Sequence, residues 1–207
     1  MNKTILGIAM SVAATVLALT GCSNGNDSAH SGMNMTSNAA PTSTAGPAAA
    51  HNTADITFAQ AMIPHHQQAV EMAGLAATRS TNTKVKDLAS RIQGAQDPEI
   101  RQMQTWLGQW GAALASSVPG MNHGSMPGGS MPGMMPDTDM QKLQQTSGGE
   151  FDKTFLQMMV QHHQGAVDMA KTELAQGANT DAKALAQRIT DGQTAEITEM
   201  QQLLSTR

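Results

Sequence analysis

The sequence predicts an all-α protein, a four-helix bundle built from two tandem helical hairpins and preceded by a disordered tether. Two observations lead to this prediction. Apolar residues recur at i, i+3, i+4 and i+7 through four segments, which is the helical spacing, and strand patterns are absent. The chain also repeats itself: residues 55–107 align without a gap with residues 152–204, and close to half of the aligned residues are identical.

The first 21 residues predict a lipoprotein signal peptide. Lys3 precedes an apolar run over residues 5–19, which is shorter than the roughly 20 residues of a membrane-spanning helix. The run ends in LTGC, which resembles a bacterial lipobox and implies lipid attachment to Cys22. We therefore expect a lipid-anchored protein of the cell envelope. It would face the periplasm from the outer membrane of a Gram-negative host, and otherwise lie on the extracellular membrane surface.

The amino-acid composition distinguishes a tether from a folded domain and excludes some classes of function. Residues 22–51 are mostly Ser, Asn, Ala, Thr, Pro and Gly, which cannot bury enough surface to fold, so we expect a disordered tether. Residues 52–207 then form one duplicated domain. The net charge of -4, without a cluster of Lys and Arg, argues against binding to nucleic acid. Cys22 is the only cysteine, so the domain has neither a disulfide nor a cysteine ligand for a metal.

The helices follow from the repeat. Within each copy a short polar segment, STNT at 80–83 or QGANT at 176–180, separates two helical patterns and predicts an antiparallel hairpin. A crossover at 116–149 joins the hairpins, and its stretch 121–140, rich in Met, Gly and Pro, is predicted to have no regular structure. Pro64 either lies inside the first helix or begins it, whereas Asp97-Pro98 predicts a kink in the second helix.

Histidines and methionines share the predicted buried face of the first helix of each repeat. At 100° per residue, an arc of roughly 120° holds the face. In the first copy it comprises Asp55, Phe58, Met62, His65, His66, Ala69 and Met72. In the second copy it comprises Asp152, Phe155, Met159, His162, His163, Ala166 and Met169. Glu71 and Asp168 fall on the opposite side and are poorer candidates for a site.

The second helix of each repeat places a carboxylate on its apolar stripe. Glu99 and Met103 lie there in the first copy, and Glu196 and Met200 in the second. A buried carboxylate needs a partner, which could be an arginine of the same helix, a histidine N–H or a metal. We predict that these four residues, with Asp55 and Asp152, support a metal site by contacting its ligands.

A face of Met and His is typical of a site for a soft metal ion. Thioether and imidazole together select Cu(I), or the similar Ag(I), over zinc and hard cations. Core packing explains a single Met on a helical stripe equally well. Two copies in one register favour metal binding, because four buried histidines without a ligand would leave many ring nitrogens unsatisfied.

The crossover carries further methionines in a segment rich in Gly and Pro, for which we predict capture of soft cations. The candidate residues are Met121, His123, Met126, Met131, Met134 and Met135, with Met140 close behind. A smaller group in the tether comprises His30, Met33 and Met35. Drift of a low-complexity sequence is the alternative explanation.

The paired motif FxxxMxxHH, followed by EM or DM and then by LAxRI…Q..EI..M..L, resembles the domain-of-unknown-function 305 family, including its CopM-like periplasmic copper-binding proteins. The resemblance covers about residues 52–207. It implies a ferritin-like bundle and metal-associated roles for Met62, His65, His66 and Met72, and likewise for Met159, His162, His163 and Met169. Pro64 matches the common motif, whereas its counterpart Gln161 departs from it.

We therefore expect an envelope lipoprotein that binds copper, preferably Cu(I), for buffering, transfer or tolerance. Its partners would be the metal ion and other copper-handling envelope proteins. Two alternatives remain open. One is a ferritin-like metal oxidase, although the ExxH motifs of di-iron bundles do not occur in the sequence. The other is a structural bundle in which the histidines are core polar groups.

Overall fold

The structure, a computed structural model, describes residues 50–114 and 131–206. All regular structure in these two ranges is helical. Four long helices and one short helix follow in the order α1 (Thr53–Arg79), α2 (Thr83–Gln109), α3 (Asp137–Gln145), α4 (Gly148–Gln176) and α5 (Thr180–Ser205). The predicted signal peptide, Cys22 and nearly all of the predicted tether lie outside the described residues. The same holds for Met121, His123 and Met126.

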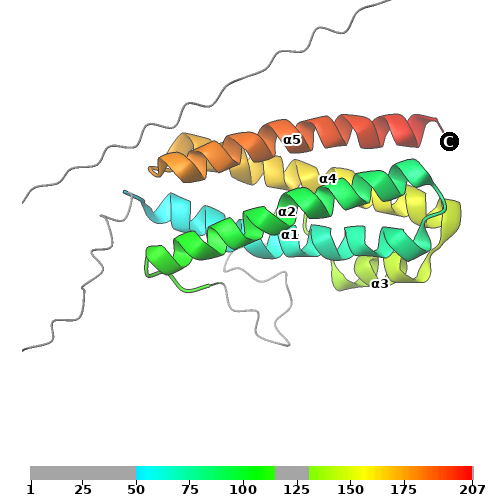
Figure 1. Cartoon of the computed structure of the whole chain (residues 1–207), viewed down its shortest axis with the longest axis horizontal. Coiled ribbons are helices and arrows are strands. Elements are labelled where there is room, and N and C mark those ends of the chain that lie inside the picture. The colour runs from blue at the N-terminus through cyan, green and yellow to red at the C-terminus, as the bar shows by residue number, and fades with distance from the viewer. Residues whose placement is uncertain (1–49, 115–130, 207) are drawn as a thin grey trace, which may run out of the picture. The chain divides into compact units, whose positions relative to one another are not determined.

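The long helices form two hairpins that pack against each other through α1 and α4 (Figure 1). α2 packs along α1, and α5 packs along α4. Asparagine caps begin three of the helices: Asn52 forms a capping box with Asp55, and the side chains of Asn82 and Asn179 accept backbone N–H bonds at the starts of α2 and α5. The two polar turns predicted from the sequence are therefore the points where each hairpin reverses.

Both internal prolines lie within continuous helices. Pro64 is inside α1, which was one of the two predicted positions, and Pro98 is inside α2. Neither helix ends at its proline, although each proline removes one backbone donor. Burial on both sides of each proline, from Ile63 to His65 and from Gln96 to Ile100, shows that tertiary packing holds the two helices together at these points.

The crossover is more ordered than predicted. Residues 137–145 form α3, which contacts α1 and α4, so the expectation of no regular structure across 121–140 is wrong for residues 137–140. Met140 and Leu143 of α3, and Met135 just before it, are buried in the core. Core packing thus accounts for Met135 and Met140, both of which the sequence places in a segment without regular structure.

The apolar core is divided into two clusters at opposite halves of the long helices. One contains Met72, Leu88, Phe155 and Met159, and the other contains Phe58, Met62, Leu107 and Leu185. Each cluster combines the turn end of one hairpin with the open end of the other, as the duplication requires. The boundary between them falls where the sequence places its histidines.

Two aspartates tie the ends of the hairpins together. Asp55 accepts hydrogen bonds from the backbone N–H groups of Ala178 and Asn179 in the turn between α4 and α5. Its counterpart Asp152 accepts one from the hydroxyl of Ser80 in the turn between α1 and α2. Each carboxylate therefore anchors the turn of the opposite hairpin. No helix in the described ranges is long and apolar enough to cross a membrane.

Candidate metal centre

The four histidines of the two helical repeats form one buried layer at the middle of the bundle. His65 and His66 lie on α1, His162 and His163 lie on α4, and all four side chains are fully buried. The rings of His65 and His162 contact each other with centroids 3.7 Å apart. Because these two residues are equivalent in the repeat, the local twofold relation passes between them. The two His pairs therefore meet in one layer, a point that periodicity alone could not decide.

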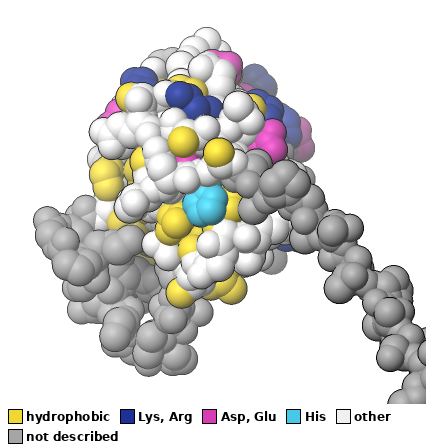
Figure 2. Space-filling view, turned by 90° about the vertical axis from the view of Figure 1, so that its left-hand side faces the viewer, with side chains coloured by type: hydrophobic (Ala, Val, Ile, Leu, Met, Phe, Trp, Pro, Cys, Tyr) yellow, Lys and Arg dark blue, Asp and Glu magenta, His cyan; other side chains and the backbone are white. Residues whose placement is uncertain are grey.

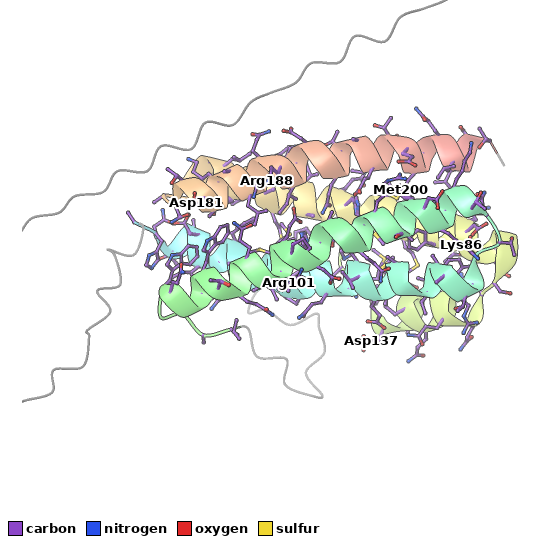
Figure 3. All side chains as sticks on the ribbon, viewed as in Figure 1. Lys86, Arg101, Asp137, Asp181, Arg188 and Met200 are labelled. Carbon is purple, nitrogen blue, oxygen red and sulfur yellow. The ribbon has the colours of Figure 1, made fainter. Side chains whose placement is uncertain are left out.

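A carboxylate fixes one histidine of each pair. Glu99 of α2 lies 2.8 Å from Nε2 of His66, and Glu196 of α5 lies 2.7 Å from Nε2 of His163. A carboxylate accepts hydrogen bonds, so Nε2 carries a proton in both rings, and in a neutral imidazole the lone pair then lies on Nδ1. Of the partners considered for these carboxylates, the structure selects the histidine N–H. Arg91 instead pairs with Glu199 at 2.6 Å, and Arg188 is exposed (Figure 3).

A backbone carbonyl fixes a third histidine. Nε2 of His65 donates to the carbonyl oxygen of Pro132, 3.0 Å away, in the segment that leads into α3. His162 is different: neither ring nitrogen makes a hydrogen bond of good geometry, although the His65 carbonyl lies close enough to offset part of the fall in its pKa. Hydrogen bonds therefore orient three rings of the layer, whereas no hydrogen bond selects a tautomer of His162.

The ring nitrogens that face the interior lack partners. Nδ1 of His65, His66, His162 and His163 makes no hydrogen bond and is inaccessible to solvent. Burial lowers the pKa of His65 to about 3, and the charge that the neighbouring His66 would carry contributes to this decrease. Burial, with the charge that His65 would carry, also holds the pKa of His162 well below its usual range. At neutral pH these two rings are uncharged and present lone pairs, the state in which imidazole binds metals.

Methionine sulfurs flank the layer on both sides. Met62 lies one helical turn before His66, and Met103 lies one turn after Glu99 on the antiparallel α2. Since His66 and Glu99 are bonded, Met62 and Met103 stand at one level, and both are fully buried in the same cluster. Met159 and Met200 are their counterparts in the other cluster, and Figure 3 shows Met200 on the C-terminal half of α5.

Other predicted residues lie farther away. Met72 and Met169 are seven residues beyond His65 and His162, about 10 Å along each helix axis. Met72 is core, whereas the half-buried Met169 lines a cavity of 340 Å³ near the end of the bundle. Asp55 and Asp152 are not brought to the layer. Of the described crossover candidates, Met131 and Met134 are half-buried beside Pro132, and Met135 is in the core.

A second carboxylate, not singled out in the sequence, accompanies Asp55. Burial raises the pKa of Glu173 to about 8, and the hydrogen bond and charge of Asp55 raise it too. Ionised Glu173 would have no donor for either oxygen, so the bond to Asp55 exists when Glu173 keeps its proton. For Asp55, burial alone would raise the pKa, but bonds from Glu173 and from backbone N–H groups lower it.

Two buried glutamines near the carboxylates were not predicted from the sequence. Gln96 and its counterpart Gln193 are buried, one turn before Glu99 and Glu196. Both amide atoms of Gln96 and the amide oxygen of Gln193 lack partners. The signal was present, because a polar residue stands in the same place in both copies of an apolar stripe.

The donor set decides which ion fits. In the described ranges, no three His, Cys, Asp or Glu side chains converge closely enough to hold an ion by themselves. A centre in this layer therefore requires thioethers beside the imidazoles. Buried neutral nitrogens and sulfurs with outer carboxylates suit a soft monovalent ion and disfavour hard cations.

Comparison with known proteins gives the family. The family model "Domain of unknown function (DUF305)" matches residues 55–204. Among curated proteins, none matches the chain. A putative secreted DUF305 protein from Streptomyces coelicolor is 35% identical, with a TM-score of 0.66 over 74% of this chain and 93% of that chain. A DUF305 fragment from Deinococcus radiodurans is 30% identical, with a TM-score of 0.66 over 78% of this chain and 100% of that chain.

A third similar structure is CopM in its Cu(I)-bound form, which is 30% identical, with a TM-score of 0.61 over 73% of this chain and 96% of that chain. CopM is also similar to this chain in its Cu(II)-bound and silver-bound forms. The matched region contains α2, α3, α4, nearly all of α1 and α5, and both histidine pairs. The chain therefore belongs to the DUF305 family.

Proposed function

We propose that this protein binds copper, preferably as Cu(I), in the histidine layer between α1 and α4, and that it buffers or transfers the ion in the cell envelope. The observation that carries the proposal is the set of buried Nδ1 lone pairs whose opposite ring nitrogens are already bonded to Glu99, Glu196 and Pro132. Metal-binding histidines characteristically donate their other N–H to a carboxylate or carbonyl in this way.

In this proposal the four histidines and the flanking methionines are the ligands of the ion. His66 and His163 are oriented ligands, and His65 and His162 complete the layer between them. Met62 and Met159 supply thioethers from α1 and α4, with Met103 and Met200 beside them at the same levels. The carboxylates of Glu99 and Glu196 offset the positive charge of the ion from outside the layer.

The oxidation state follows from the ligand chemistry. Neutral thioether and imidazole donors in a buried site stabilise Cu(I), and Ag(I) would bind in the same way. The similarity to CopM, which is known in Cu(I)-, Cu(II)- and silver-bound forms, supports a copper-related function. Substrate oxidation is a weaker alternative, because all four rings of the layer are fully buried and present no surface to a substrate.

The outlying parts of the chain complete the proposal. The four long helices form a ferritin-like bundle with α3 as an addition in the crossover. Residues 1–21 are a signal peptide, Cys22 carries a lipid, and residues 22–51 tether the bundle to the envelope membrane, in keeping with a putative secreted relative. Met121, His123, Met126, Met131 and Met134 capture ions, which other copper-handling envelope proteins deliver or receive.

The direct test is retention of Ag(I), a redox-inert probe, and of Cu(I) through desalting at neutral pH. We expect stoichiometric retention by the purified protein. The double variants His65→Ala/His66→Ala and His162→Ala/His163→Ala should lose it, because each removes two of the four rings. Circular dichroism shows whether each variant keeps its helices.

The matched control replaces residues 115–130 by Gly and Ser. This variant should keep the ions bound in the layer and lose only those bound by the crossover. Full retention by both folded histidine variants would overturn the proposal and assign binding to the crossover.

A further inference from the structure

The segment Met131–Met135, here called the strap, crosses the junction of α1 and α4 directly above the histidine layer. On the α4 side, the backbone of the strap lies in close contact with the backbone of α4. Gly133 adopts a φ of 77°, and a Cβ there would stand 2.7 Å from the Gln161 carbonyl oxygen. A Cβ at Gly165 would overlap the Pro132 carbonyl. Two glycines that face each other thus allow backbone to lie on backbone.

On the α1 side, two hydrogen bonds clamp the strap. The buried side chain of Gln68 donates to the Met135 carbonyl at 2.9 Å and accepts from the Met135 N–H at 2.8 Å. A side-chain amide that bonds both backbone groups of one residue fixes the direction of the segment as well as its distance. The strap therefore has a defined register over the layer, and that register brings the Pro132 carbonyl to His65.

The contact with His65 completes a pattern. Glu99 holds His66, Glu196 holds His163, and each bond leaves an unpartnered Nδ1 directed into the protein. The Pro132 carbonyl does the same for His65. No equivalent acceptor holds His162, because the strap lies over one half of the duplicated structure and Gln68 stands at the position that corresponds to Gly165.

We propose that the strap is a positioning element for the metal centre: the Pro132 carbonyl fixes His65 as the Nε2–H tautomer, so that Nδ1 is the atom offered to the ion. The two halves of the duplicated centre are then inequivalent, with His65 set in advance and His162 adjusting when the ion binds. This inference rests on the proposed function for its effect on affinity, whereas the tautomer can be measured in the metal-free protein.

The main test uses Gly165→Ala, whose added methyl group must push the strap away. Its control is Gly192→Ala on α5, where an added Cβ meets nothing within 4 Å. The measurements are ¹⁵N chemical shifts of the His65 ring in the metal-free protein and competitive titration with Ag(I). We expect a single Nε2–H tautomer in the wild type and in Gly192→Ala. In Gly165→Ala we expect mixed tautomers and roughly 10-fold weaker binding, the lower range for loss of such a partner.

A second variant covers the case in which Gly165→Ala does not fold. Gln68→Ala removes both bonds to Met135 without adding bulk and should shift the tautomer and the affinity in the same direction. Unchanged His65 shifts and unchanged affinity in a folded strap variant would overturn the inference. If the wild type binds no Ag(I), the proposed function fails, and the His65 shifts alone then decide whether the strap orients the ring.

Discussion

At the scale of single residues, the histidine layer is determined by what lies behind each ring. A neutral imidazole has one donor and one acceptor nitrogen, and an outer acceptor that takes the proton leaves the lone pair facing inward. Glu99 and Glu196 do this from the second helix of each hairpin. Their side chains remain 19% exposed, so they keep some hydration while the rings they bond are fully enclosed.

The carboxylates give the first residue-level prediction. Glu99→Gln and Glu196→Gln should each weaken Ag(I) or Cu(I) binding by about 10-fold, because a neutral amide orients the ring less firmly and offsets less charge. Competitive titration measures the effect, with Glu71→Gln on the exposed face of α1 as the control. Equal affinity in all three variants would show that the two carboxylates have only a structural role.

Glu173 gives a prediction about pH. Its pKa is raised to about 8 in the folded protein from a usual value near 4.5, so the folded state holds the proton more tightly than the unfolded chain. The free energy of unfolding should therefore fall as pH rises from about 5 to 8, by on the order of 1–3 kcal/mol.

The control for Glu173 is the neutral variant. Glu173→Gln removes the titration, so urea unfolding at pH 5 and pH 8 should differ less in this variant than in the wild type. The idea fails if both proteins show the same change between the two pH values. Metal affinity should be unaffected, because Glu173 lies at the end of the bundle beside Asp55.

At the scale of helices, each hairpin is held at its turn by an aspartate of the other. Asp55 doubles as the capping-box residue of α1 and as the acceptor for the turn before α5, whereas Asp152 binds Ser80 in the turn before α2. Hydrogen bonds to a buried charged group are among the stronger ones in proteins. These contacts fix the relative positions of α1 and α4, on which the meeting of His65 and His162 depends.

The helix-scale prediction separates support of the fold from support of the metal. Asp55→Ala should lower the free energy of unfolding by about 2–4 kcal/mol, because several backbone donors lose their acceptor. Metal affinity of the folded variant should be unchanged. Thermal unfolding and Ag(I) titration test this, with the exposed Asp168→Ala as the control. A large loss of affinity without loss of stability would restore Asp55 as a residue that supports the metal site.

The long helices were predictable because each carries a full apolar stripe and appears twice. α3 was not, because its nine residues contain only two apolar side chains, Met140 and Leu143, amid Gly- and Pro-rich sequence. The candidate His and Met residues could be found from their shared face. Their union in one layer could not, since it depends on the register of α1 against α4. The Pro132 contact joins residues 67 positions apart and has no local signal.

At the scale of the whole molecule, the duplicated halves have diverged on one side. The strap and α3 cover α1 and α4 on one half of their shared seam, over Met72, Phe151, Phe155 and Met158. On the other half lies the 340 Å³ cavity, where smaller or more polar residues occupy corresponding positions. Ala54 stands opposite Phe151 in the alignment, Ala61 opposite Met158, and Glu173 opposite Ala76. Loss of large apolar residues fits a surface that α3 does not cover.

This end of the bundle also exposes apolar side chains. Figure 2 shows a histidine among the apolar side chains on this side of the molecule. His51 is half-buried and stacks on Trp110 with ring centroids 4.9 Å apart, whereas the other four described histidines are fully buried. His51 lies just before α1, remote from the layer, and pairs with Trp110 at the end of α2. Surface histidine and core histidine therefore have different roles in the same chain.

The most direct measurement is anomalous diffraction from crystals of the silver-loaded protein. We expect silver between α1 and α4, bonded to Nδ1 atoms of the histidine layer and to sulfur of Met62 or Met159, with Glu99 and Glu196 still bonded to Nε2. Silver found only at crossover methionines, with the four rings unchanged, would contradict it.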